Sequence, residues 1–177
     1  ITLRGNSTLK SEGMLWTYAS YWSNNVTIDE NTTATIVATS QNDVAVGIFQ
    51  SSVYISSGTV IATKVNSETG GDATAVNCSA RWAHNTTCRI SGGTITATNN
   101  SSGSAVAVSG YSDDRNTADV IISGGTITAT ANTGGAYGFV NSNDRYSTTR
   151  VVVSGGSISA TSASNTGFGM NISATKN

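Results

Sequence analysis

The residues whose chemistry an enzyme would use are few and scattered in this sequence. His84 is the only histidine, and Cys78 and Cys88 are the only cysteines. Two acidic pairs, Asp29-Glu30 and Asp113-Asp114, have no histidine beside them, and neighbours on a β-strand point to opposite sides of it. No Ser/His/Asp arrangement, phosphate-binding loop or dinucleotide fingerprint is present. We therefore expect no catalytic activity, no cofactor and no metal site.

The two cysteines stand ten residues apart in one polar stretch. A metal site would need further ligands at fixed spacing, which His84 alone does not supply. We expect a disulfide between Cys78 and Cys88, which would stabilise the fold by roughly 3 kcal/mol if it is unstrained. Structural disulfides form in oxidising compartments, so the pair predicts an extracellular or cell-surface protein.

Small polar residues dominate the composition, because 27 Thr, 26 Ser, 19 Gly and 17 Asn account for half of the 177 residues. Proline is absent, which suits long ladders of backbone hydrogen bonds because each proline removes a donor. The net charge is -1 without a basic cluster, so we expect no nucleic-acid partner. No apolar run is long enough for membrane insertion. The start at Ile1 without Met indicates a mature or excised segment.

Eight Asn-x-Ser/Thr sequons occur, a mild excess over what chance gives for this composition. Glycans would improve the solubility of an extracellular protein with so few charges, so we expect glycosylation at these positions. The sequons begin at Asn6, Asn25, Asn31, Asn77, Asn85, Asn99, Asn100 and Asn171.

One nine-residue motif recurs along the chain. Ile-Ser-Gly-Gly-Thr-Ile-Thr-Ala-Thr fills residues 90–98 and again residues 122–130. Variants occupy residues 153–161 and 55–63, and a degenerate copy ends at Thr39. The spacing between copies varies while the motif is retained, which indicates fixed strands joined by variable loops.

Each repeat predicts three short strands, called a, b and c. Strand c is the Thr-x-Thr-x-Thr segment, whose two-residue alternation points Ile95 and Ala97 to one side and the threonines to the other. Strand b precedes it, and Ser-Gly-Gly forms the corner between them. Strand b is expected at residues 53–55, 120–122 and 151–153, and strand a at residues 44–48, 73–76, 105–108, 136–140 and 167–170.

Strands this short bury an apolar side only when coils stack on one another. We therefore predict an all-β fold, a single-stranded β-helix or β-solenoid of about six three-strand coils. Crossovers between parallel strands are right-handed, and we expect the same hand here. Residues 1–177 form one domain with part-coils at residues 1–11 and 167–177. The predicted inner columns are Ile36, Val60, Ile95, Ile127 and Ile158, with Ala38, Ala62, Ala97, Ala129 and Ala160 beside them.

The nine-residue unit, followed by Ala-Val-Gly-Ile or Ala-Tyr-Gly-Phe in strand a, resembles repeats of bacterial surface β-solenoids. This resemblance, over residues 44–170, implies a surface location, and some members of the group bind polysaccharides. Members that use calcium show Asp-Asp-Gly next to strand a. Here Arg115 follows Asp113-Asp114 beyond strand a, so we do not expect calcium.

The Thr-x-Thr-x-Thr segments also resemble the ice-binding face of insect antifreeze solenoids. Threonine is equally an ordinary outward residue of a strand. The pattern breaks at Ile61 and changes to serine at residues 157 and 159, which speaks against a regular ice-binding lattice. The residues of this Thr face would be Thr94, Thr96, Thr98, Thr126, Thr128 and Thr130.

Charges gather in the three loops expected between strands a and b, at residues 78–89, 109–119 and 141–150. These loops hold 9 of the 19 charged residues, and stacking would place them along one edge. Arginine mixed with aromatic residues is typical of interfaces, whereas charged loops are also ordinary solvated surface, and both interpretations stay open. The candidate contact residues of this loop rim are Arg81, Trp82, Tyr111, Asp113, Asp114, Arg115, Asp144, Arg145 and Tyr146.

The two ends of the sequence read as complementary part-coils without a polar or helical cap. Residues 1–11 would supply strands b and c, and residues 167–170 would supply strand a. We therefore expect a structural subunit that assembles head-to-tail with copies of itself into a filament or surface layer. Two alternatives stay open: a glycan-binding or adhesive module using the loop rim, and an ice-binding protein using the Thr face. The expected subunit contacts are Ile1, Leu3, Leu9, Phe168, Met170 and Ile172.

Overall fold

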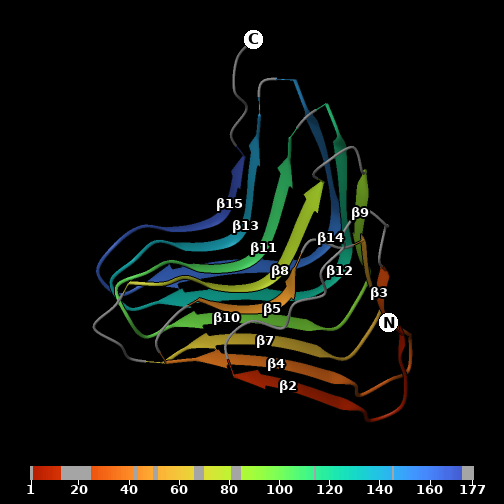
Figure 1. Cartoon of the computed structure of the whole chain (residues 1–177), viewed down its shortest axis with the longest axis horizontal. Coiled ribbons are helices and arrows are strands. Elements are labelled where there is room, and N and C mark those ends of the chain that lie inside the picture. The colour runs from red at the N-terminus through yellow and green to blue at the C-terminus, as the bar shows by residue number, and fades with distance from the viewer. Residues whose placement is uncertain are drawn as a thin grey trace.

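The computed structural model describes residues 2–12, 25–41, 44–49, 52–65, 70–80, 85–113, 115–144 and 146–172. Within these residues every regular element is a β-strand, and every strand pairing is parallel. The predicted all-β solenoid of stacked coils is therefore confirmed (Figure 1). Its right-handed winding and its number of coils stay predictions.

Three walls enclose the core, one for each predicted strand type (Figure 1). Wall b consists of β1 (Thr2–Leu3), β3 (Asn25–Ile28), β6 (Ser52–Ile55), β9 (Thr86–Ile90) and the first halves of β12 (Thr117–Ala131) and β14 (Thr148–Ser162). Wall c consists of β2 (Thr8–Glu12), β4 (Thr35–Ser40), β7 (Thr59–Lys64), β10 (Thr94–Asn99) and the second halves of β12 and β14. Wall a consists of β5 (Ala45–Phe49), β8 (Ala73–Ala80), β11 (Ala105–Ser112), β13 (Ala136–Asn143) and β15 (Gly167–Ile172). Walls b and c form one ten-stranded sheet because β12 and β14 run through the corner between them, whereas wall a is a separate five-stranded sheet.

The core is built from columns of equivalent positions in successive coils. On wall c, Ile36, Val60, Ile95 and Ile127 stack in register, and each is at most 2% exposed. Ile158 continues this column on β14, where it is only partly buried. The predicted inward and outward alternation of strand c is confirmed. The alanine column beside it runs through Ala38, Ala62, Ala97, Ala129 and Ala160.

The Ser-Gly-Gly corners between walls b and c require glycine for a steric reason. Gly93 and Gly125 have φ values of 80° and 85°, in the left-handed region that side chains rarely adopt. A Cβ on Gly93 would also lie 2.6 Å from the carbonyl oxygen of Ser57 in the adjacent coil. The stacked corners leave no space for a side chain, which explains why the motif recurs.

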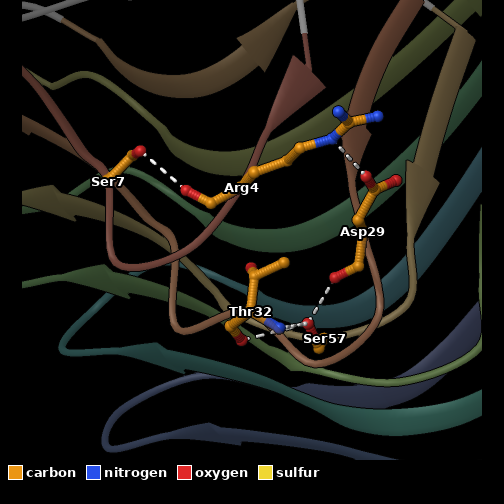
Figure 2. Close-up of polar contacts among 5 residues, drawn as sticks. All are labelled: Arg4, Ser7, Asp29, Thr32 and Ser57. Carbon is orange, nitrogen blue, oxygen red and sulfur yellow. Dashed lines mark hydrogen bonds and ion pairs between the residues drawn. The ribbon is translucent and has the colours of Figure 1, made fainter.

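The corner between β3 and β4 is longer, and a serine from the following coil fills it (Figure 2). The hydroxyl of Ser57 donates to the carbonyl oxygen of Asp29 at 2.6 Å and accepts from the N–H of Thr32 at 3.1 Å. Arg4 of the preceding coil forms an exposed ion pair with Asp29, in which Nε lies 2.9 Å from Oδ2. The acidic pair Asp29-Glu30 therefore belongs to a corner, where the Asp29 carboxylate contacts Arg4 of the preceding coil.

Wall a is longer than predicted, and the loops that follow it are correspondingly shorter. The polar residues that end β11 and β13 pair in register, as Ser112 does with Asn143. Backbone hydrogen bonds between the strands stabilise these ends. Their side chains are polar, so the sequence shows no apolar alternation that would predict a strand there. β8, β11 and β13 extend to Ala80, Ser112 and Asn143, and β9, β12 and β14 begin at Thr86, Thr117 and Thr148, so strands occupy both ends of the loops expected at residues 78–89, 109–119 and 141–150.

Replacing Ile95 by Ala should lower the free energy of unfolding by about 2–5 kcal/mol, because Ile95 is fully buried in the wall c column. Thr96→Ala is the matched control on the same strand. Its side chain points outward, so the change should stay within about 0.5 kcal/mol. Denaturant unfolding of both variants measures the difference. Equal losses would show that the assigned register is wrong.

Candidate functional site

The coil formed by β14 and β15 is the most exposed apolar part of the described chain. Each of these strands is paired on one side, β14 with β12 and β15 with β13 (Figure 1). Val153 is 42% exposed and Met170 is 41% exposed, whereas their neighbours in the same columns, Ile122 and Phe139, are fully buried. The core is therefore open in cross-section at this C-terminal coil.

The predicted contact residues of β15 take two different positions. Met170 continues the inward column of Phe139, and Ile172, 54% exposed, continues the inward column of Asn141. Phe168 instead lies on the outer face of wall a, where its ring stacks on Tyr137 with centroids 5.6 Å apart. Met170 and Ile172 thus belong to the open cross-section, whereas Phe168 extends an outer aromatic pair at its rim.

The opposite end of the solenoid is closed by comparison. Leu3 on β1 is 6% exposed, although among the described strands β1 pairs with β3 alone. Leu9 on β2 is partly buried against the core. Leu3 was expected to form a subunit contact, and little of its side chain is left for such a contact to cover. Ile1 lies outside the described residues.

Charge distinguishes the two ends as well. Arg150 is the only charged residue between positions 148 and 172. Its Nε lies 2.9 Å from Oδ1 of Asp119 on the adjacent strand, and the hydrogen bond to this carboxylate raises the pKa of Arg150. The N-terminal strands and their corner carry Arg4, Lys10 and Glu12. The C-terminal coil is therefore both more apolar and less charged.

The loop rim is assembled in part. The guanidinium carbon of Arg115 lies 6.0 Å from the ring centroid of Tyr146, which comes from the next loop and is 64% exposed. Asp113 and Asp144 begin equivalent turns, in which their carbonyl oxygens accept from the N–H groups three residues later. Tyr111 is not a loop residue as expected, because it lies on β11 beside Ser142. Arg81, Trp82, Asp114 and Arg145 lie outside the described residues.

The Thr face is regular over a short distance. Thr94, Thr96 and Thr98 on β10 pair with Thr126, Thr128 and Thr130 on β12, and all six point outward. In the middle column the neighbour of Thr96 on β7 is Ile61, and the neighbour of Thr128 on β14 is Ser159. Among the described strands, only β10 and β12 therefore carry threonine in all three columns, whereas the two outer columns continue through Thr59 and Thr63 on β7.

The cysteines lie on strands rather than in the loop that was expected. Cys78 is on β8 in wall a, and Cys88 is on β9 in wall b. Both are free thiols and fully buried, and Cys88 neighbours Cys78 in the core. Burial raises the pKa of Cys78, and the contact with Cys88 adds to this. A disulfide here would join two walls across a corner of the core, and it stays a prediction.

One of the eight predicted sequons is incompatible with the fold. Asn99 is fully buried, and its Nδ2 donates to the carbonyl oxygens of Gly71 at 2.7 Å and Ser104 at 2.9 Å. A glycan would attach to this same nitrogen, so Asn99 cannot carry one in the folded protein. Asn77 and Asn171 are partly buried. The exposed sequon positions are Asn6, Asn25, Asn31, Asn85 and Asn100.

A buried lysine was missed by reasoning from the sequence. Lys64 is fully buried at the end of β7, where its Nζ donates to the carbonyl oxygen of Gln41 at 2.8 Å. It occupies the inward position of Ser40 and Asn99 in the adjacent coils. Alignment of the repeats would have placed Lys64 opposite these polar residues, which is the signal that it points inward.

No protein-family model, curated protein or solved structure matches this chain. The class of the protein therefore rests on its fold, a parallel β-solenoid with one open apolar coil. The described residues contain no helix able to span a membrane and no group of three or more His, Cys, Asp or Glu arranged to hold a metal ion.

Protein recovered from an oxidising medium should contain a Cys78–Cys88 disulfide, because the two thiols are buried as neighbours in the core. Mass spectrometry after alkylation in denaturant, with and without prior reduction, measures this. The bond should resist reductants in the native protein and yield once the fold is opened. Two alkylated thiols in unreduced protein would contradict the prediction.

Proposed function

We propose that this protein is an extracellular structural module that assembles through its open C-terminal coil as part of a surface structure. The observation that carries the proposal is the apolar cross-section at β14 and β15. Val153, Met170 and Ile172 are 41–54% exposed at positions whose equivalents elsewhere form the core. Apolar surface of this kind on a soluble protein marks an interaction site.

The energetics favour covering this coil with another β-solenoid coil. Burying a whole Val, Ile or Met side chain contributes roughly 1.5–3 kcal/mol, so the exposed parts of these three and of Ile158 contribute several kcal/mol together. A strand edge adds unpaired N–H and C=O groups that a matching strand satisfies. A β-strand is therefore a better partner for this surface than a helix or an irregular segment.

An extracellular location is supported by composition and by the cysteine pair. Half of the chain is Thr, Ser, Gly or Asn, and only 11% is charged. Buried thiols in contact are positioned to form a stabilising bond in an oxidising compartment. Five exposed sequons also offer glycosylation sites.

The head-to-tail filament is one form that such assembly takes. In that form the columns of both ends would continue into each other, because Leu3 and Val153 belong to one column, as do Leu9 and Ile158. The burial of Leu3 reduces what this contact would gain. A filament therefore depends mainly on Leu9 and on the strand edges of β1 and β2.

The chain should associate in a concentration-dependent way, and Met170→Lys should shift it to the 18.0 kDa monomer. The reason is that a lysine at this inward position would place a charge in the apolar contact. Light scattering coupled to size exclusion measures the mass, and negative-stain imaging shows whether the assembly is a filament. Thr130→Lys, exposed on the outer face of wall c, is the matched control and should associate normally. A wild-type monomer at every concentration would contradict the proposal.

A glycan-binding module is the second candidate, favoured by the contact between Arg115 and Tyr146. An exposed aromatic ring beside an arginine suits a sugar ring that carries an acidic group. Binding to an array of immobilised acidic and neutral polysaccharides should then fall at least tenfold in Tyr146→Ala and persist in Tyr146→Phe. Absence of binding by the unmodified protein would leave the structural role alone. The ice-binding alternative is not adopted, because the middle threonine column is interrupted by Ile61 on β7 and by Ser159 on β14.

A further inference from the structure

We infer that the partner of the open coil is the same coil of a second copy, so that two chains meet tail to tail in a closed dimer with two-fold symmetry. This inference rests on the proposed function, because it presupposes association through β14 and β15. It adds the identity of the partner and the register of the contact. Three independent properties of the two ends carry it.

The first property is the difference in exposure between the ends. Val153 is 42% exposed on β14, whereas Leu3, in the same column at the other end, is 6% exposed. A contact between unlike ends would pair an open apolar surface with one that is already covered. A contact between two C-terminal coils covers open surface on both copies, so it removes more apolar area from water.

The second property is self-complementarity on wall c. A two-fold axis across the solenoid would pair the wall c part of β14 with itself in antiparallel orientation. When the strands are centred on Ser159, Ile158 faces the partner's Ala160, and Ala160 faces the partner's Ile158. Both residues are partly buried members of inward columns. A large side chain thus meets a small one twice, which fills the space without overpacking.

The third property is charge. The same two-fold axis places wall b of one copy against wall a of the other, so Arg150 would lie opposite β15. This strand has no charged residue, and Arg150 is already paired with Asp119. The tail-to-tail contact therefore brings no like charges together. It also pairs the free edges of both C-terminal coils, which stops growth at two chains.

A single cysteine in place of Ser159 tests the partner and the register together. Ser159 points outward, and in the inferred register it lies opposite its own copy. Facing residues of antiparallel strands have Cα atoms about 4.5–5.5 Å apart, which lies within the range of disulfides of about 4.4–6.8 Å. Mild oxidation of Ser159→Cys should therefore give a covalent dimer in high yield. Thr96→Cys, outward in the same column on the interior strand β10, is the matched control and should stay uncross-linked.

Four further outcomes test this inference together with the proposed function. A wild-type chain that stays monomeric in light scattering overturns both. An association that Met170→Lys abolishes, but in which Ser159→Cys does not cross-link, overturns the inferred register and leaves the structural role standing. A ladder of oligomers in the double variant Lys10→Cys/Ser159→Cys, without dimers in Ser159→Cys alone, overturns the tail-to-tail contact and establishes the head-to-tail filament. A covalent dimer from Val152→Cys in place of Ser159→Cys would show self-pairing through wall b, which also overturns the register.

Discussion

The in-register stacking of parallel coils is the constraint on which this structure depends. Within the paired strands, each residue lies over its equivalent in the next coil, so a core side chain must fit the size and polarity of its neighbours in the column. Ile95 therefore lies between Val60 and Ile127, and the glycine corners superpose because a Cβ on Gly93 would reach the carbonyl oxygen of Ser57. The repetition of the sequence is the consequence of this one geometric rule.

The same rule explains how a core so poor in large side chains holds together. Successive coils are joined by backbone hydrogen bonds along all three walls, and polar residues enter the interior where a column or corner satisfies them. Asn99 and Lys64 lie in the same inward column. Asn99 donates hydrogen bonds to two carbonyl oxygens, and Lys64 donates one to the carbonyl oxygen of Gln41. Ser57 fills the longer corner beside Asp29. Variation is confined to corners and loops, where hydrogen bonds to side chains replace the ladder.

A stack of equivalent coils also leaves an interaction surface at its end, because the last coil has no further coil to pair its strand edges and cover its apolar side chains. In the coil of β14 and β15 the last residues of the apolar columns are exposed, whereas Leu3 in the coil at the other end is buried. Apolar area, free strand edges and low charge coincide at one surface. The proposed assembly would therefore follow from the architecture itself, whereas the contact between Arg115 and Tyr146 belongs to loops that vary independently of it.

The sequence by itself determined the strands, their inward and outward alternation and the glycine corners, because each of these is a local property that recurs with the motif. Residues 90–98 contain all three. The true length of wall a, the meeting of Cys78 with Cys88 and the burial of Lys64 and Asn99 were decided by the tertiary structure. They depend on which residues share a column, and loops of unequal length hide that register from the sequence. The unequal exposure of the two ends has the same origin, since covering a coil is a property of the whole stack and of no single repeat.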